Sequence, residues 1–197
     1  MASIEQLKSV VSRNGGIARN NLFTMVLPSI SGVNTNPEEL NVLCRDVQLP
    51  GRQILSNERR IGMQLEKVAY GYAVTDVSAT FLCLNDYGVK DYFESWQNIT
   101  LNQDTYEVAY KNEYAAPIKI YQLAKNKLTR SVNLYNTNIL DILNVGLNLN
   151  FRTDTVYGCE LIDAYPTTIN ALQLNNELDG VLELNVQFSY KNWRRII

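Results

Sequence analysis

Histidine is missing from all 197 residues of the sequence. It is the commonest general base, the commonest metal ligand and the usual partner of a nucleophilic serine or cysteine, so its absence excludes most hydrolytic and metal-dependent chemistry. The glycine-rich phosphate-binding and dinucleotide-binding motifs, the zinc-protease motif and the serine-hydrolase motif are missing too. We therefore expect a protein that is not an enzyme and has no catalytic residues, metal site or cofactor.

Cysteine is scarce, and the three present, Cys44, Cys83 and Cys159, lie far apart with no C-x-x-C spacing. An odd number of separated cysteines favours a reducing compartment over a disulfide framework, and we expect each to lie in a strand as a small apolar residue. Long apolar runs are missing as well, and residues 1–6 lack the basic-then-apolar layout of a secretory signal. These features predict neither membrane insertion nor classical export.

Neither sign of charge is in excess, because 18 Lys and Arg face 20 Asp and Glu and leave a formal net charge of −2. Such a balance creates no strong field for a polyanion, so a dedicated nucleic-acid-binding protein is not expected. A hydrophobic content of 46% and an aromatic content of 10% predict a folded chain with a real core.

What the sequence does contain is strand patterning, clearest from Leu182 to Tyr190, where every second residue is apolar. This alternation predicts a strand with one buried and one wet face. A second strand is predicted over 157–169, running into a turn stopped by Pro166. Alternation or short apolar runs predict further strands at 22–27, 41–49, 61–70, 77–83, 118–123 and 145–151.

One internal helix is predicted over residues 86–99, with Asn85 or Asp86 as its cap. Its apolar stripe consists of Val89, Tyr92, Phe93, Trp96 and Ile99, and we expect these side chains to lie over a sheet. Residues 29–39 are predicted to be a polar loop. Residues 1–19 are predicted to form an N-terminal arm or short helix that ends at the hinge Gly15-Gly16.

These elements predict a mainly β fold, a β-sandwich or barrel of six to eight strands with one flanking helix. Residues 20–197 are expected to form a single β domain after the arm at 1–19. Within it, residues 52–62 carry several charges and few apolar anchors, so this segment is expected to be an exposed loop.

Several segments resemble a known family when taken in chain order. They are the strand entry at 19–23, the turn Leu49-Pro50-Gly51, the helix segment 93–96, the run 165–169 and the strand that ends near Tyr190 and Trp193. Their succession resembles the tail tube proteins of contractile-tailed bacteriophages over most of residues 17–193. The chain departs from the compact family pattern at 125–155, which looks like an insertion.

The resemblance implies a subunit of six-membered rings that stack into a hollow tube inside a contractile sheath. It implies tail sheath, baseplate and tail-terminator proteins as partners. It also implies a place in the phage virion after assembly in the host cytoplasm, and transient passage of DNA without specific binding. A chain of nearly neutral charge fits that passage, since each neutralised phosphate adds salt-sensitive affinity.

The edges of a small sheet also favour assembly, because unpaired amides and carbonyls of edge strands can pair with another copy. We predict that residues 51–72 form an extended hairpin that bridges adjacent subunits and contacts the next ring. The candidate contacts are its charged residues, Arg52, Glu58, Arg59, Arg60, Glu66 and Lys67.

Other functions remain open at this point. A baseplate protein that initiates the tube, or the tube of a contractile secretion system, would share the architecture. Tyr106, Tyr110 and Tyr114 recur at every fourth position and could instead belong to a carbohydrate-binding β-sandwich. An enzyme is the remaining and least favoured alternative.

Overall fold

The computed structural model describes residues 3–14, 16–30, 33, 35–123, 155–175 and 180–197. The helices are α1 (Ile4–Arg13), α2 (Pro37–Leu43), α3 (Gly88–Thr100) and α4 (Lys111–Tyr114). The strands are β1 (Phe23–Val26), β2 (Cys44–Val47), β3 (Gln53–Ile61), β4 (Gln64–Ala73), β5 (Val77–Leu82), β6 (Ala116–Leu123), β7 (Thr155–Ile169), β8 (Glu183–Ser189) and β9 (Asn192–Arg195). The fold is therefore mainly β, as the sequence predicted.

Two compact units are distinguished by their contacts, one holding residues 24–120 and 159–196 and the other residues 1–23, 121–158 and 197. In the smaller unit, α1 has a capping box in which the Ser3 and Gln6 side chains each accept from the other's backbone amide. The same unit holds the Leu123 amide 2.8 Å from the Leu22 carbonyl.

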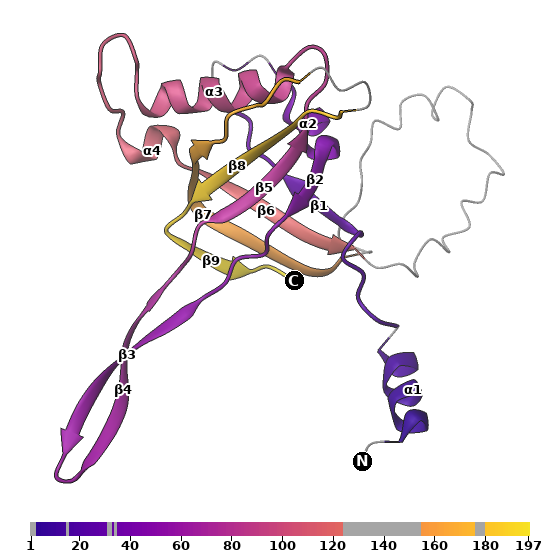
Figure 1. The fold of residues 1–197 in the computed structure, drawn as a ribbon, viewed down its shortest axis with the longest axis vertical. Helices are drawn as coiled ribbons and strands as arrows, with labels where there is room; N and C mark the ends of the chain where they lie inside the picture. Colours follow the sequence, from indigo (N-terminus) through magenta and orange to yellow (C-terminus); the bar gives the residue numbers. More distant parts are fainter. Residues whose placement is uncertain (1–2, 15, 31–32, 34, 124–154, 176–179) are drawn as a thin grey trace, which may run out of the picture. The chain divides into compact units, whose positions relative to one another are not determined.

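The main sheet has the order β1-β6-β7-β8-β5-β2, with β9 paired to β7, and β3 with β4 forms a separate two-stranded sheet (Figure 1). Its central pair, β5 with β8, is antiparallel and regular from Val77↔Phe188 to Leu82↔Glu183. Alternate residues of both strands are buried, including Phe81, Leu184 and Phe188, which are 0% exposed. The alternation at 77–83 and 182–190 thus predicted these two strands correctly.

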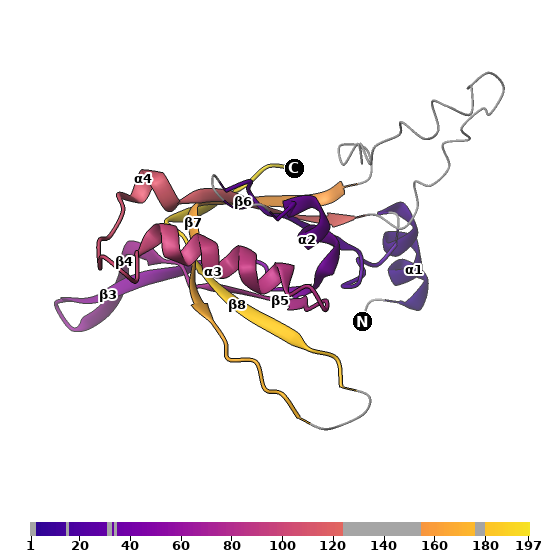
Figure 2. The ribbon, with the colours of Figure 1, turned by 90° about the horizontal axis from the view of Figure 1, so that it is seen from above.

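Helix α3 lies over β5 and β8 (Figure 2). Its aromatic side chains pack against residues of these two strands. The Phe93 ring lies 5.0 Å from that of Phe81 and 5.7 Å from that of Phe188, between ring centroids. Burying Phe93 and Trp96 contributes about 2–3 kcal/mol each, which a helix of this length needs because it is marginal in water. The prediction of the helix is confirmed, but it begins at Gly88 rather than at residue 86, and the predicted cap Asn85 or Asp86 is wrong because Tyr87 is the N-cap.

The polar atoms of the α3 stripe are satisfied inside the core. The Tyr92 hydroxyl donates to the Pro28 carbonyl at 2.6 Å, and Trp96 Nε1 donates to the Tyr114 carbonyl at 2.7 Å. Burial raises the pKa of Tyr92 well above its usual value, so the phenol stays protonated and keeps donating. These bonds tie the helix to the segments before α2 and after α3.

Strand β7 pairs with three strands, β6, β8 and β9, and Asp163, between its β9-paired and β8-paired parts, has a φ of +54°. Its residues Cys159–Ile162 pair with β9, and its residues Tyr165–Ile169 pair with β8. The predicted stop at Pro166 is wrong, since Pro166 lies inside β7 opposite Phe188 and a register shift follows it. Proline is tolerated at such an irregularity, where ladder hydrogen bonds are already interrupted.

The region before β2 also departs from expectation. The strand predicted over 41–49 is confined to Cys44–Val47, because Pro37–Leu43 form α2 instead. Asn36 Oδ1 accepts from the Glu38 amide at 3.1 Å, Pro37 occupies the first turn, and Leu40 is buried. The predicted loop at 29–39 therefore ends in a helix. The predicted insertion at 125–155 and the strand at 145–151 lie outside the described residues, apart from Thr155, which begins β7.

Candidate assembly surface

Strands β3 and β4 form a long antiparallel hairpin whose register runs from Gln53↔Ala73 to Ile61↔Gln64. Gly62 at the tip has a φ of +65°, which glycine adopts without strain. The hairpin predicted over 51–72 is thus present, while the prediction of a loop at 52–62 is wrong. The pattern was missed because charged residues face solvent on both sides of β3, so no apolar alternation marks it as a strand.

The hairpin places apolar side chains in solvent along its whole length. Among the described strands it pairs with no other, and within it Leu65 is 72% exposed and Met63 is 100% exposed. The other large apolar residues exposed on it are Ile54, Ile61, Val68, Tyr70 and Tyr72. A lone two-stranded hairpin is at best marginally stable in water, and clustered exposed apolar residues mark interaction surfaces. The arrangement is suited to being covered by another molecule.

Charged residues are interspersed with these apolar side chains. Lys67 Nζ lies 3.7 Å from Glu58 Oε1 across the strands, and the Arg59 backbone pairs with that of Glu66. Arg60 Nε donates to the Gly62 carbonyl at 3.2 Å. The structure therefore brings five of the six candidate residues together on one hairpin. Exposed ion pairs of this kind contribute about 0–1 kcal/mol, so these side chains can exchange partners at little cost.

Arg52, the sixth candidate, lies at the base of the hairpin and is engaged within the chain. Its Cζ lies 5.1 Å from the centroid of the Tyr72 ring and 5.0 Å from that of the Trp193 ring. Its Nη2 donates to Asn192 Oδ1 at 3.1 Å and to the Trp193 carbonyl at 3.2 Å. Each cation–π contact contributes about 0.5–1 kcal/mol at an exposed site. This cluster was not predicted from the sequence, although an aromatic residue between polar ones in a terminal strand was a weak signal for it.

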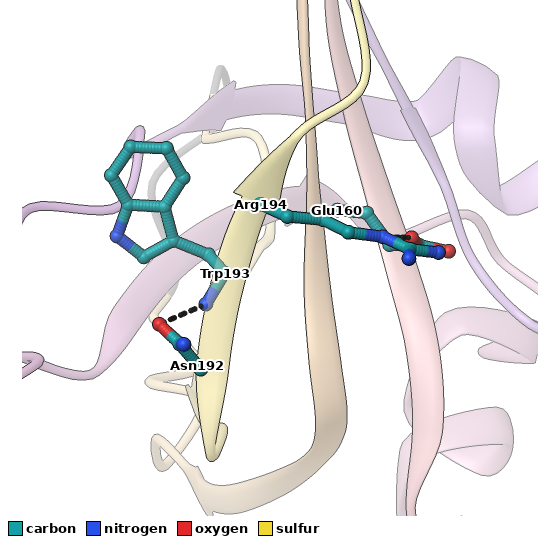
Figure 3. Close-up of polar contacts among 4 residues, drawn as sticks. All are labelled: Glu160, Asn192, Trp193 and Arg194. Atoms are coloured by element: carbon teal, nitrogen blue, oxygen red, sulfur yellow. Dashed lines mark hydrogen bonds and ion pairs between the residues drawn. The ribbon is translucent and has the colours of Figure 1, made fainter.

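Strand β9 presents different chemistry on its two faces (Figure 3). The Trp193 ring stands on one side, while Arg194 extends on the other side to Glu160 of β7, and Arg194 Nε lies 2.6 Å from Glu160 Oε2. The Glu160 residue is only 7% exposed, so its carboxylate depends on this partner. The Trp193 amide donates to Asn192 Oδ1 at 2.8 Å. Strand β9 is therefore fixed to β7 and also offers a surface to the hairpin base.

At the far end of the sheet path from β1, the short strand β2 lies beside β5. Arg45 of β2 forms an ion pair with Glu183 of β8. Sheet edges of this kind can accept a further strand from another copy.

All three cysteines are free thiols, with Cys159 buried and Cys44 and Cys83 half-buried. Cys44 and Cys159 lie in strands, as expected, whereas Cys83 follows the end of β5. Burial raises the pKa of Cys44 to about 12 and that of Cys159 to about 11, so little reactive thiolate forms at neutral pH. In the described part of the chain, no group of three Cys, Asp or Glu residues could hold a metal ion. Among the described residues, no helix is long and apolar enough to cross a membrane.

The three tyrosines of the carbohydrate-binding alternative do not share one helical stripe. Tyr110 precedes the four-residue helix α4 and Tyr114 ends it, while Tyr106 has a φ of +56°. The Tyr114 ring packs edge-on against that of Tyr165, 5.1 Å between centroids. This arrangement offers no continuous aromatic platform among residues 106–114.

Comparison with known proteins supports a tube fold. No curated protein matches the sequence. Among solved structures, one similar chain belongs to the anti-feeding prophage baseplate, solved with six-fold symmetry, at 11% identity and a TM-score of 0.54, covering 92% of this chain and 95% of that one. Another belongs to the sheath/tube terminator of the extracellular contractile injection system PVC in its extended state, at 11% identity and a TM-score of 0.56, covering 92% and 97%.

A third similar chain belongs to the PVC sheath-tube complex, at 13% identity and a TM-score of 0.51, covering 99% of this chain and 98% of that one. Because the sequence identities are this low, these structural matches establish a shared fold and nothing further. A family model described as "Phage tail tube protein" matches residues 17–196. The resemblance inferred from the order of the sequence elements is confirmed, and the chain belongs to the phage tail tube protein family.

Proposed function

We propose that this chain is a structural tail tube subunit whose copies form six-membered rings that stack into the hollow inner tube of a contractile tail. The observation that carries the proposal is the long hairpin β3–β4, which lies outside the main sheet and exposes apolar side chains at most of its length. In a chain of the tail tube family, an uncovered hairpin of this kind provides a surface that a neighbouring copy can bind.

Covering the hairpin provides the free energy for association. Fully burying side chains such as Leu65, Met63 and Val68 contributes about 1.5–3 kcal/mol each. The exposed charges Arg59 and Glu66 give the contact its specificity, because like charges brought together at an interface oppose wrong pairings. The apolar residues therefore supply affinity, and the charged ones select the partner surface.

Ring closure follows from the open sheet. Strand β2 lies at one end of the strand order, and a contact between different edges of identical copies is head-to-tail. Such contacts form a ring when the rotation between copies closes on itself. Edge contacts then link copies within a ring, and the hairpin reaches a neighbouring copy or the next ring.

Genome passage belongs to the same proposal. The net charge of −2 provides no surplus of cations to retain phosphate, so DNA passes without specific binding. The tail sheath, baseplate and terminator proteins are the proposed partners, and the phage virion, assembled in the host cytoplasm, is the proposed location. The proposed role is structural and non-enzymatic.

Charge reversal on the hairpin tests the proposal. The double variant Arg59→Glu and Arg60→Glu should fold normally and fail to form tubes, because it places four acidic side chains, with Glu58 and Glu66, where two acidic and two basic ones stood. A matched control reverses two exposed cations outside the hairpin, Arg19→Glu and Lys111→Glu. Negative-stain microscopy and sedimentation measure the outcome. Normal tubes from the hairpin variant would contradict the hairpin contact.

The wild-type protein also distinguishes the alternatives. The fold is shared with baseplate and terminator assemblies, so a tube initiator is a second candidate. Long hollow tubes of purified protein identify a tube subunit, whereas isolated rings or short stacks identify an initiator. Dispersed monomers at high concentration would overturn both assignments.

A further inference from the structure

The base of the hairpin contacts the segment that follows β8, including Asn192 and Trp193 of β9. Arg52 is stacked between the Tyr72 and Trp193 rings, and its guanidinium also donates to Asn192 and to the Trp193 backbone. Trp193 Nε1 in turn donates to the Gly51 carbonyl at 3.2 Å. We name the set Arg52, Tyr72, Asn192 and Trp193 the clasp.

Both strands of the hairpin are connected to this segment by hydrogen bonds at the hairpin base. Just before the first strand, Gly51 and Arg52 contact Asn192 and Trp193. Beyond the end of the second strand, β4, the Thr75 carbonyl accepts from the Tyr190 hydroxyl at 2.9 Å. The residues beyond the base are exposed, so the contacts at the base determine where the hairpin points.

Two residues of the clasp, Asn192 and Trp193, lie in β9, which is held in place by its pairing with β7. In β9, Asn192 and Trp193 pair with Ile162 and Leu161 of β7, and Leu161 is 0% exposed. The next residue is held by the Arg194–Glu160 ion pair. The part of the clasp on β9 therefore cannot shift without disturbing the sheet.

We propose that Arg52 is a positioning residue that fixes the direction in which the hairpin leaves the sheet. A guanidinium is planar, so both of its faces can stack on aromatic rings while its edge donates hydrogen bonds, whereas a lysine ammonium has no planar face to place between two rings. In assembly, Arg52 then sets the angle at which the hairpin meets the neighbouring copy. This second step depends on the proposed function; the first does not.

The first step is tested by a distance measurement on the full chain. Spin labels are placed at Gln64→Cys in the hairpin tip and Asp91→Cys on α3, with Cys44 and Cys83 replaced by serine and the labelled protein diluted in unlabelled protein. Arg52→Ala should broaden the distance distribution by about twofold, since a hinge replaces a fixed base. Arg52→Lys should give an intermediate width, and Arg59→Ala, which removes the same residue type higher on β3, should change nothing.

A fold control accompanies this measurement. The midpoint of thermal unfolding of Arg52→Ala should fall by only about 2–8 °C, as the loss of two cation–π contacts predicts for a chain of this size. Unfolding should remain a single cooperative transition, so a loss of overall structure does not explain the broadening. If Arg52→Ala proves poorly soluble, Trp193→Leu removes the other side of the same contact and should broaden the distance distribution in the same way. An unchanged distance distribution in both variants would overturn the positioning role.

The second step is tested by assembly of the same variants without labels. Arg52→Ala should lose tube formation while remaining folded, and Arg52→Lys should retain part of it. A broadened distance distribution together with normal tubes would overturn the role of Arg52 in assembly. It would still support the role of Arg52 in fixing the hairpin direction within a single chain. A wild-type chain that never assembles would overturn the proposed function instead, and the distance result would still decide the first step.

Discussion

Two antiparallel strand pairs of this chain, β5 with β8 and β3 with β4, have regular registers and opposite surroundings. In the first pair alternate side chains are buried under α3, whereas both strands of the second pair are exposed almost throughout. Backbone pairing is therefore common to both, and apolar burial distinguishes them. The chain itself covers β5–β8, whereas the described residues leave β3–β4 uncovered, and the proposed contact with another copy would cover it.

Hydrogen exchange should show the largest difference between the two pairs. In the unassembled chain, amides of β5 and β8 should open with the global unfolding free energy, about 5–15 kcal/mol, and those near Gly62 with about 0–2 kcal/mol. In assembled protein the hairpin amides should become protected. Equal protection of both pairs in the monomer would contradict the comparison.

A matched pair of leucine truncations gives the next largest effect. Leu184→Ala removes a fully buried side chain of β8 and should lower the unfolding free energy by about 2–5 kcal/mol. Leu65→Ala removes an exposed one of β4 and should change it by less than about 0.5 kcal/mol while weakening assembly. Urea unfolding and sedimentation measure the two effects. A large loss of monomer stability from Leu65→Ala would show that the chain already covers the hairpin.

Arginine truncations extend the same comparison to charge. Arg194→Ala leaves the buried Glu160 carboxylate without its ion-pair partner and should cost about 1–3 kcal/mol. Arg59→Ala on the exposed hairpin should cost less than about 0.5 kcal/mol. Both values come from urea unfolding of the unassembled protein. Equal costs would mean that water, rather than Arg194, satisfies Glu160.

Much of the fold could be predicted because one-sided burial leaves a periodic signal. Strands β5 and β8 and helix α3 each bury one face, and the sequence alternates accordingly. Helix α2 was not predicted because the alternation over 41–49 runs through its last residues, although Asn36 followed by Pro37 is a helix-start signal. The passage of β7 through Pro166 depends on a bulge that tertiary pairing creates, and local sequence does not reveal it.

The candidate site could be predicted only in part, for a related reason. Charge and flanking alternation located the hairpin and five exposed charged residues on it, and their role between copies stays a prediction. The engagement of Arg52 could not be foreseen, because Trp193 lies far along the sequence and approaches it only through the pairing of β9 with β7. Contacts set by strand topology leave no local pattern.

The attachment of the hairpin by Tyr190, Asn192 and Trp193 has a consequence for biosynthesis. The ribosome makes β3 and β4 well before the segment that orients them. A nascent or prematurely terminated chain can form the turn at Gly62 but lacks Tyr190, Asn192 and Trp193, which orient the hairpin. Under the proposed function, translation products that lack β9 should therefore be excluded from the growing cylinder.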